Sequence, residues 1–212
     1  VAMGITGTEV AKSAAKIVVT DDNFATIVAA VEQGRVVYGN LKKVLLYLFA
    51  TSIDEVLVLL LALLAGYPLP LAAVQILWIN IVTEGTLTVN LVMDPPDGDE
   101  MRRAPTPRDD PLVDRTMLAR VLLMASAAVA ATFGWFAWRH AQGVPLDQLR
   151  TETFTVLAMC QWFNLMNCRS ATASALRLRG VANRWLAAGL AASVLLQGLV
   201  LYAPPLNTMF HT

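Results

Sequence analysis

Five long apolar stretches constrain this chain more than any other feature. They cover residues 44–65, 72–93, 117–138, 153–168 and 185–203. An α-helix needs about 20 residues to cross the hydrocarbon core of a bilayer, and only the fourth stretch is clearly shorter than that. The chain is 56% hydrophobic and 15% charged, whereas ordinary soluble domains are roughly a quarter charged. We therefore predict a mainly α, polytopic transmembrane helix bundle of about five spans, with the lipid bilayer as its surroundings.

Charge and cysteine usage exclude several other classes. The formal net charge is zero, so the composition gives no reason to expect a nucleic-acid partner. Cys160 and Cys168 lie eight residues apart in one apolar stretch, a spacing that fits neither a zinc site nor a disulfide framework. We interpret both cysteines as small buried hydrophobic residues.

The chain begins with a short segment of mixed character. Residues 1–24 combine glycines, a helical stretch and a β-branched run, which is an α/β pattern too small to bury its own core. The opening VAMGITGTEV has no signal-peptide pattern. Its first residues look like the end of a β-strand, so we expect a fragment of a longer polypeptide. A proline-free helix should follow over residues 25–43 with Asp21 or Asp22 as its N-cap, and residues 44–212 should form the membrane domain.

Basic residues predict the orientation in the membrane, because cytoplasmic segments retain lysine and arginine. If residue 1 is cytoplasmic, only Arg139 and Arg150 of the 16 lysines and arginines fall on the opposite side. Residues 66–70, which contain a glycine and two prolines, predict a tight hairpin on that far side. We expect a multi-pass protein with the residue 1 side in the cytoplasm.

Three carboxylates fall in the middle of predicted spans. Asp54 and Glu55 lie in the first stretch and Glu84 lies in the second. Each costs about 2.5 to 3.5 kcal/mol at a helix centre, so these groups must be paired, protonated or bound to a cation. Asn80 and Thr83 precede Glu84 at spacings that place all three on one helix face. Ser52 or Thr51 shares a face with Glu55 in the same way.

Oxygen ligands predict the kind of ion. Carboxylates, amides and hydroxyls suit a hard cation such as calcium, which takes six to eight oxygens. Gly85 should allow the helix to loosen and expose backbone carbonyls. Gln161, Asn164 and Asn167 add a polar stripe in the fourth stretch.

A second interpretation stays open for these polar residues. Amide and hydroxyl side chains often join membrane helices by hydrogen bonds without binding an ion. That alternative applies most to Gln161, Asn164, Asn167 and Asn90, because helix association rarely needs carboxylates. Asp54 points about 100° away from Glu55 around the helix, so it faces another helix or a water-filled vestibule.

Several strings resemble the type II P-type ATPases, the class of the calcium and sodium/potassium pumps. Residues 3–43 read MGITGTEVAKSAAKIVVTDDNFATIVAAVEQGRVVYGNLKK, which resembles the end of the phosphorylation domain and the stalk of the fifth membrane helix. Residues 75–86, QILWINIVTEGT, resemble the sixth helix, and DPPDGDEM at 94–101 resembles the loop after it. The second half agrees in the number of spans and in the run QWFNLMN. The resemblance implies that residues 1–24 are a remnant of a cytoplasmic HAD-like domain.

The resemblance also implies a ligand set. Glu55 matches the fifth-helix carboxylate, and Asn80, Thr83 and Glu84 match the sixth-helix ligands. In calcium pumps the position of Glu84 is usually Asp and that of Ser52 usually Asn, while Gln161 matches a carboxylate of the eighth helix. These departures favour a single site, completed by a fourth-helix glutamate outside this chain. Asp54 stands where the family often has glycine or proline. The implied metal ligands are thus Glu55, Asn80, Thr83, Glu84, Ser52, Asp54 and Gln161.

The family's catalytic parts are not in this sequence, which has no D-K-T-G-T, T-G-E or G-D-G-x-N-D string. We therefore expect the parent to supply the actuator, nucleotide-binding and phosphorylation domains, the first four membrane helices and a tenth helix. The resemblance implies ATP and Mg²⁺ as cofactors of that parent and export of a cation, with calcium favoured, across a bacterial cytoplasmic membrane. A pump for sodium, potassium, manganese or protons is an alternative, as is a non-catalytic channel or scaffold.

Overall fold

The computed structural model describes residues 1–212 apart from 97, 106, 108–110, 170–182 and 211. The chain divides into two compact units. One unit comprises Val1–Gly39 and Pro96–Thr106, and the other comprises Asn40–Pro95 and Pro107–Thr212.

The first unit contains the small α/β segment expected from the sequence. Strands β1 (Ala2–Met3) and β2 (Val18–Val19) pair in parallel, and helix α1 (Glu9–Ala14) connects them. The Thr8 hydroxyl caps α1 by accepting a hydrogen bond from the Ala11 amide.

The residues between β2 and the next helix have other roles than the sequence predicted. Asn23, and neither Asp21 nor Asp22, accepts a hydrogen bond from the Ala25 amide at the start of that helix, at 3.0 Å. The N-cap prediction was wrong because both aspartates have other partners. Asp21 accepts from the Thr26 hydroxyl. Asp22 accepts from the backbone amides of Ile5 and Thr6 at 2.8 and 2.7 Å.

Helix α2 (Phe24–Leu64) runs for 41 residues without a break. It covers both residues 25–43 and the first apolar stretch up to Leu64. Within the first unit, the Arg35 guanidinium donates hydrogen bonds to the backbone carbonyls of Glu100 and Arg103 at 2.7 and 2.9 Å. Glu100 and Arg103 are therefore tied to the first part of α2.

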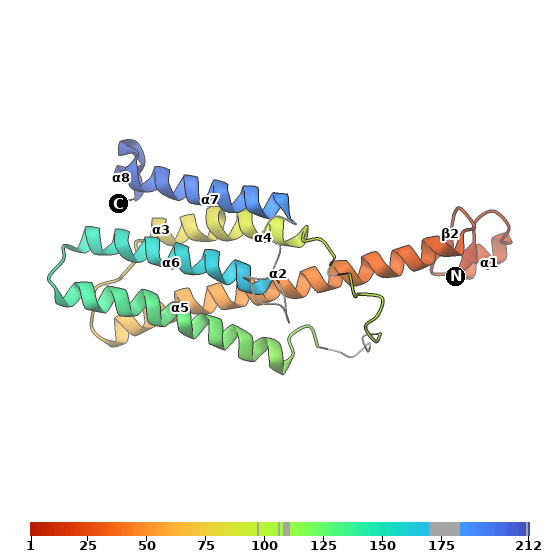
Figure 1. The fold of residues 1–212 in the computed structure, drawn as a ribbon, viewed down its shortest axis with the longest axis horizontal. Helices are drawn as coiled ribbons and strands as arrows, with labels where there is room; N and C mark the ends of the chain where they lie inside the picture. The colour runs from red at the N-terminus through yellow and green to blue at the C-terminus, as the bar shows by residue number, and fades with distance from the viewer. Residues whose placement is uncertain (97, 106, 108–110, 170–182, 211) are drawn as a thin grey trace. The chain divides into compact units, whose positions relative to one another are not determined.

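The second unit is a helix bundle (Figure 1). After the second part of α2 it contains α3 (Ala73–Trp78), the π-helix η1 (Ile79–Glu84), α4 (Gly85–Val92), α5 (Arg115–Ala141), α6 (Leu146–Cys168), α7 (Arg184–Tyr202) and α8 (Pro204–Phe210). Helix α5 packs beside α6, and α4 packs beside α7. Gly66 adopts a positive φ of 72° in the predicted hairpin between α2 and α3.

The mainly α membrane bundle predicted from the sequence is confirmed, with differences in detail. In the part of the chain that the structure describes, three helices are long and apolar enough to cross a membrane, namely α2, α5 and α7. The second stretch forms α3, η1 and α4 in direct succession. The fourth stretch begins at Leu146 rather than at residue 153, because the mostly polar residues 146–152 continue the helix and bury Leu149. The sequence did not predict α8.

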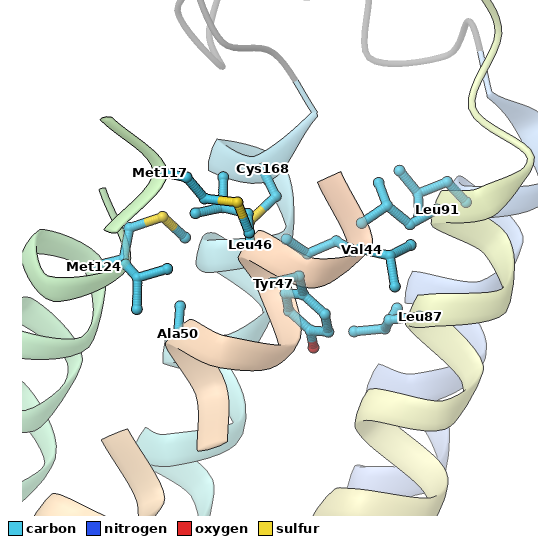
Figure 2. Packing of buried hydrophobic residues seen from close by; sticks show 12 residues of the cluster. Val44, Leu46, Tyr47, Ala50, Leu87, Leu91, Met117, Met124 and Cys168 are labelled. Carbon is cyan, nitrogen blue, oxygen red and sulfur yellow. The ribbon is translucent and has the colours of Figure 1, made fainter. Parts of the chain in front are cut away.

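Apolar clusters lie on both sides of a polar layer along α2. Val44, Tyr47 and Ala50 pack with residues of α4, α5, α6 and α7 in the first cluster. Figure 2 shows Leu87 and Leu91 of α4 facing Val44 and Tyr47, with Met117 and Cys168 beside Leu46. Further along α2, Ala62 packs with Phe136 and Leu149 in another cluster. Residues 51–55 lie between these clusters, and they carry the polar groups.

Candidate cation site

The second stretch changes helix type where the sequence places its polar residues. Over Ile79–Glu84 the backbone is a π-helix, and the Gly85 amide donates to the carbonyl of Asn80, five residues earlier. The helix therefore departs from α geometry beside Gly85, as a widened turn rather than as an open loop. Single π-turns inside α-helices occur frequently at functional sites.

Glu55 of α2 and Glu84 of η1 meet at one amide of α6. The Gln161 side-chain nitrogen donates to Glu55 Oε1 at 3.1 Å and lies 3.4 Å from Glu84 Oε1. Asn80 Nδ2 donates to Glu55 Oε2 at 3.2 Å. Glu55 and Glu84 are 7% and 5% exposed, and Gln161 is fully buried. Carboxylates from two neighbouring spans thus converge inside the bundle.

The hydroxyl residues of the predicted set divide into buried and exposed ones. Thr83 is buried in η1, and Thr51 is buried in α2 beside Glu84. The Thr51 hydroxyl donates to the carbonyl of Tyr47 at 3.0 Å. Ser52 is exposed, so the structure does not bring it to the two carboxylates. Of the two hydroxyls that share a face with Glu55 by spacing, Thr51 is the one near Glu84.

Asp54 is fully buried, and neither of its carboxylate oxygens has a hydrogen-bond partner among the described residues. It lies close enough to Glu55 and Glu84 for their charges to interact. Gln161 Oε1 is a further buried acceptor without a partner among the described residues, while the Tyr47 hydroxyl and the Asn164 amide nitrogen are buried groups able to donate that also have none. Buried acceptors without donors are costly, so the oxygens of Asp54 and Gln161 favour a species that is positively charged or donates protons.

Sequence reasoning missed Tyr47, although a signal existed. Tyr47, Thr51 and Glu55 recur at every fourth position of α2, which places them on one helix face. The Tyr47 ring was hidden in an apolar run, where an aromatic residue normally indicates packing. Figure 2 shows this ring beside Leu87, with its hydroxyl at the edge of the apolar cluster.

The donor set consists of oxygens rather than sulfur or imidazole. Among the described residues, no group of three or more His, Cys, Asp or Glu side chains is arranged as a metal site. The convergent groups are instead two carboxylates, the two amides of Asn80 and Gln161, and neighbouring hydroxyls. Mixed sets of this kind suit hard cations that also accept carbonyl and water ligands.

Comparisons with known proteins agree with this architecture. Residues 68–212 match the family model described as "Cation transporting ATPase, C-terminus". The whole chain is 42% identical over 212 residues to the probable cation-transporting ATPase F of Mycobacterium tuberculosis and 39% identical over 213 residues to a calcium-transporting ATPase of Bacillus subtilis. It is also 36% identical over 213 residues to the human calcium-transporting ATPase type 2C member 1.

In each case all of this chain is covered, but it spans only 23 to 24% of the relative's length. The matched region begins just before α3 and includes η1, α4, α5, α6 and α7. It therefore contains Asn80, Glu84 and Gln161, whereas Glu55 lies in the preceding helix. On this basis the chain belongs to the cation-transporting ATPase family, of which it represents the C-terminal membrane region.

Proposed function

We propose that this chain is the cation-translocating part of an ATP-driven calcium pump. We further propose that Glu55 and Glu84 hold the transported ion together with Gln161. The observation that carries this proposal is the amide of Gln161, which lies within 3.1 and 3.4 Å of the two carboxylates. Ionisable residues inside a membrane are costly and by default indicate a functional site. Here two such carboxylates from different helices share one hydrogen-bond donor.

Amide rotation provides a route from this arrangement to an ion site. The nitrogens of Asn80 and Gln161 face the carboxylates. A half-turn of either amide exchanges the nitrogen for the carbonyl oxygen, and a hydrogen-bond donor thereby becomes a ligand. A divalent ion entering between Glu55 and Glu84 would replace the donated hydrogen bonds and add these oxygens to its shell.

The remaining predicted ligands have different positions around this centre. Thr83 is buried on the same π-turn as Glu84 and can add an oxygen. Asp54 supplies a third carboxylate whose oxygens have no protein donor among the described residues. Asn80 is exposed and donates to Glu55, so we assign it to the edge where a ligand from outside this chain completes the shell. A fourth-helix glutamate, implied by the family resemblance, suits that position. Ser52 is exposed away from the two carboxylates, and we leave it out of the shell.

Long helix α2 suits the coupling of the ion site to ATP hydrolysis. It contains Glu55 and extends 31 residues back to Phe24 without a break. In our proposal ATP and Mg²⁺ bind to other parts of the complete polypeptide, and α2 transmits their domain movements to Glu55. We place the protein in a bacterial cytoplasmic membrane with the residue 1 side in the cytoplasm, because that side carries most of the basic residues.

Calcium-stimulated ATP hydrolysis by the complete polypeptide in vesicles tests the proposal. Glu84→Gln and Glu55→Gln should each abolish or strongly weaken the calcium dependence, because each removes a charged ligand. Glu32→Gln is the matched control, since Glu32 is an exposed carboxylate on the same helix as Glu55. Calcium dependence that is unaltered in Glu84→Gln would remove this site assignment.

The same vesicles distinguish the alternatives. Substituting Mn²⁺, Na⁺ or K⁺ for Ca²⁺ in the assay identifies a pump for another cation, and a dependence on pH alone identifies a proton pump. A channel or scaffold would give ion flux without ATP, or no flux at all. ATP-dependent calcium uptake that Glu84→Gln eliminates is the result that the calcium-pump proposal requires.

A further inference from the structure

A second buried polar cluster lies at one end of the bundle, around Asp94. Asp94 Oδ2 accepts from Lys43 Nζ of α2 at 3.0 Å. Asp94 Oδ1 accepts from Asn183 Nδ2 at 3.2 Å, and both Nε and Nη2 of Arg169 lie 3.4 Å from it. Asp94, Arg169 and Asn183 are all buried. Together with Asn40 of α2, we call these residues the Asp94 knot.

The knot also caps the end of α4. The last carbonyls of a helix lack partners within the helix. Here Asn40 Nδ2 donates to the carbonyls of Val92 and Asp94 at 3.0 and 2.7 Å. Asn183 Nδ2 donates to the carbonyl of Asn90 at 3.1 Å. The end of α4 is therefore held by side chains of α2 and of the segment that starts α7, and not only by its own loop.

Charge favours the same arrangement. Lys43 and Arg169 bring two cations to a helix C-terminus, where the helix dipole attracts positive charge. One buried carboxylate serves both cations, so its removal would leave the guanidinium of Arg169 buried without its countercharge. Asn183 in turn accepts from the Leu186 amide at 3.0 Å and so caps α7. The knot thus joins α2, α4, α6 and α7 at one point.

The position of the knot along the helices matters for Glu55 and Glu84. Glu55 lies 12 residues after Lys43 on α2, and Glu84 lies 10 residues before Asp94. At about 1.5 Å per residue, these separations correspond to roughly 18 and 15 Å along two helices. The knot consequently fixes the axial register in which the two carboxylates meet. A slip of one residue, about 1.5 Å, would break the shared contacts with Gln161.

We propose that Asp94 is a positioning residue for ion transport, which sets the register between α2 and the α3, η1 and α4 segment and carries axial movement of α2 to Glu84. This inference rests on the proposed function of Glu55 and Glu84. Asp94 itself does not touch the ion, because it lies about 15 Å from Glu84 along the helix. It acts through the geometry of the two helices that the knot holds together.

Variants of the complete polypeptide test this role, with calcium as the probe. Asp94→Asn and Lys43→Gln should raise the calcium concentration for half-maximal ATPase stimulation about tenfold, which corresponds to about 1.4 kcal/mol. Lys43→Arg keeps the charge and should restore the affinity of the parent. Asp99→Asn is the control, because Asp99 pairs with Arg103 in an exposed ion pair outside the knot.

A merely structural role gives a different result. If Asp94→Asn and Lys43→Gln lower only the amount or thermal stability of the pump, and the half-maximal calcium concentration stays within twofold of the parent, the positioning role is refuted. If Asp94→Asn does not fold, Lys43→Gln decides, since it removes one cation and keeps the buried carboxylate. If the calcium dependence survives Glu84→Gln, the proposed site is refuted. If Glu84→Gln abolishes the calcium dependence but Asp94→Asn leaves the calcium affinity unchanged, only the positioning role is refuted.

Discussion

Replacing Gln161 by leucine tests the geometry of the carboxylate pair directly. The change removes the amide that donates to Glu55 Oε1 at 3.1 Å and approaches Glu84 Oε1 at 3.4 Å. A hydrogen bond to a charged group contributes about 1.5 to 3 kcal/mol, and the longer contact exceeds the usual range. We therefore count one full bond, about 2 kcal/mol, plus the cost of leaving buried carboxylates with fewer donors.

Gln197→Leu is the matched control for this substitution. Gln197 of α7 is also buried, but neither of its side-chain polar atoms has a hydrogen-bond partner among the described residues. Leucine there removes two unpaired polar atoms and loses no bond, so it should stabilise the protein. Leucine at Gln161 removes one unpaired oxygen but also removes the nitrogen that donates to Glu55. We expect Gln161→Leu to be the less stable variant by about 3 kcal/mol.

Thermal unfolding of the complete polypeptide in detergent, with calcium chelated, measures this comparison. We expect the highest unfolding temperature for Gln197→Leu, an intermediate one for the parent and the lowest for Gln161→Leu. Equal shifts in the same direction for the two leucine variants would refute the reasoning. Such a result would mean that the Gln161 amide does not hold the carboxylates.

Two further predictions concern packing and acid stability. A Cβ at Gly189 of α7 would overlap the Asn90 side chain, whereas nothing lies within 4 Å of a Cβ at Gly198. Gly189→Ala should therefore lower the unfolding temperature, because overpacking costs about 1 to 3 kcal/mol. Gly198→Ala is the control and should not lower it. In the first unit, a hydrogen bond from the Thr6 hydroxyl and bonds from the Ile5 and Thr6 amides lower the pKa of Asp22 from 3.8 to about 2. Because the folded pKa is lowered, this contribution to stability is present above the usual pKa and is lost as pH falls through about 2. Hydrogen exchange of residues 4–7 should report that loss, and Asp22→Asn should exchange faster near neutral pH.

Long-range periodicity made most of the fold predictable. Apolar runs of about 20 residues leave few alternatives to membrane helices. Residues 25–43 contain no proline, which permits the uninterrupted helix α2. Local signals failed where side chains compete for the same backbone groups. Asp21, Asp22 and Asn23 are all good N-caps by type, and only the tertiary contacts of Asp22 with Ile5 and Thr6 leave the role to Asn23.

Contacts between distant segments were less accessible from the sequence. Helical spacing grouped Asn80 with Glu84 because that relation is local, and both residues lie in η1. The choice between Thr51 and Ser52 depends on how α2 is rotated in the bundle, which no local pattern determines. The Asp94 knot combines residues separated by up to 143 positions, from Asn40 to Asn183. Asn40, Lys43 and Asp94 stand in strings that resemble the family, but nothing in the sequence connects them with Arg169 and Asn183, so only the packed bundle reveals the cluster.

The polar layer and the apolar clusters have opposite effects on stability, and this opposition suits a site that must bind and release an ion. Tyr47 and Ala50 on one side and Ala62 on the other are fully buried and hold α2 in place. Between them, Asp54 and Gln161 have acceptor oxygens without protein donors among the described residues. A bound cation would satisfy these acceptors and would stabilise the protein by about 2.7 kcal/mol at a hundredfold excess over its Kd. Because the apolar clusters hold the helices without that contribution, our proposed site would release its ion while the bundle stays folded.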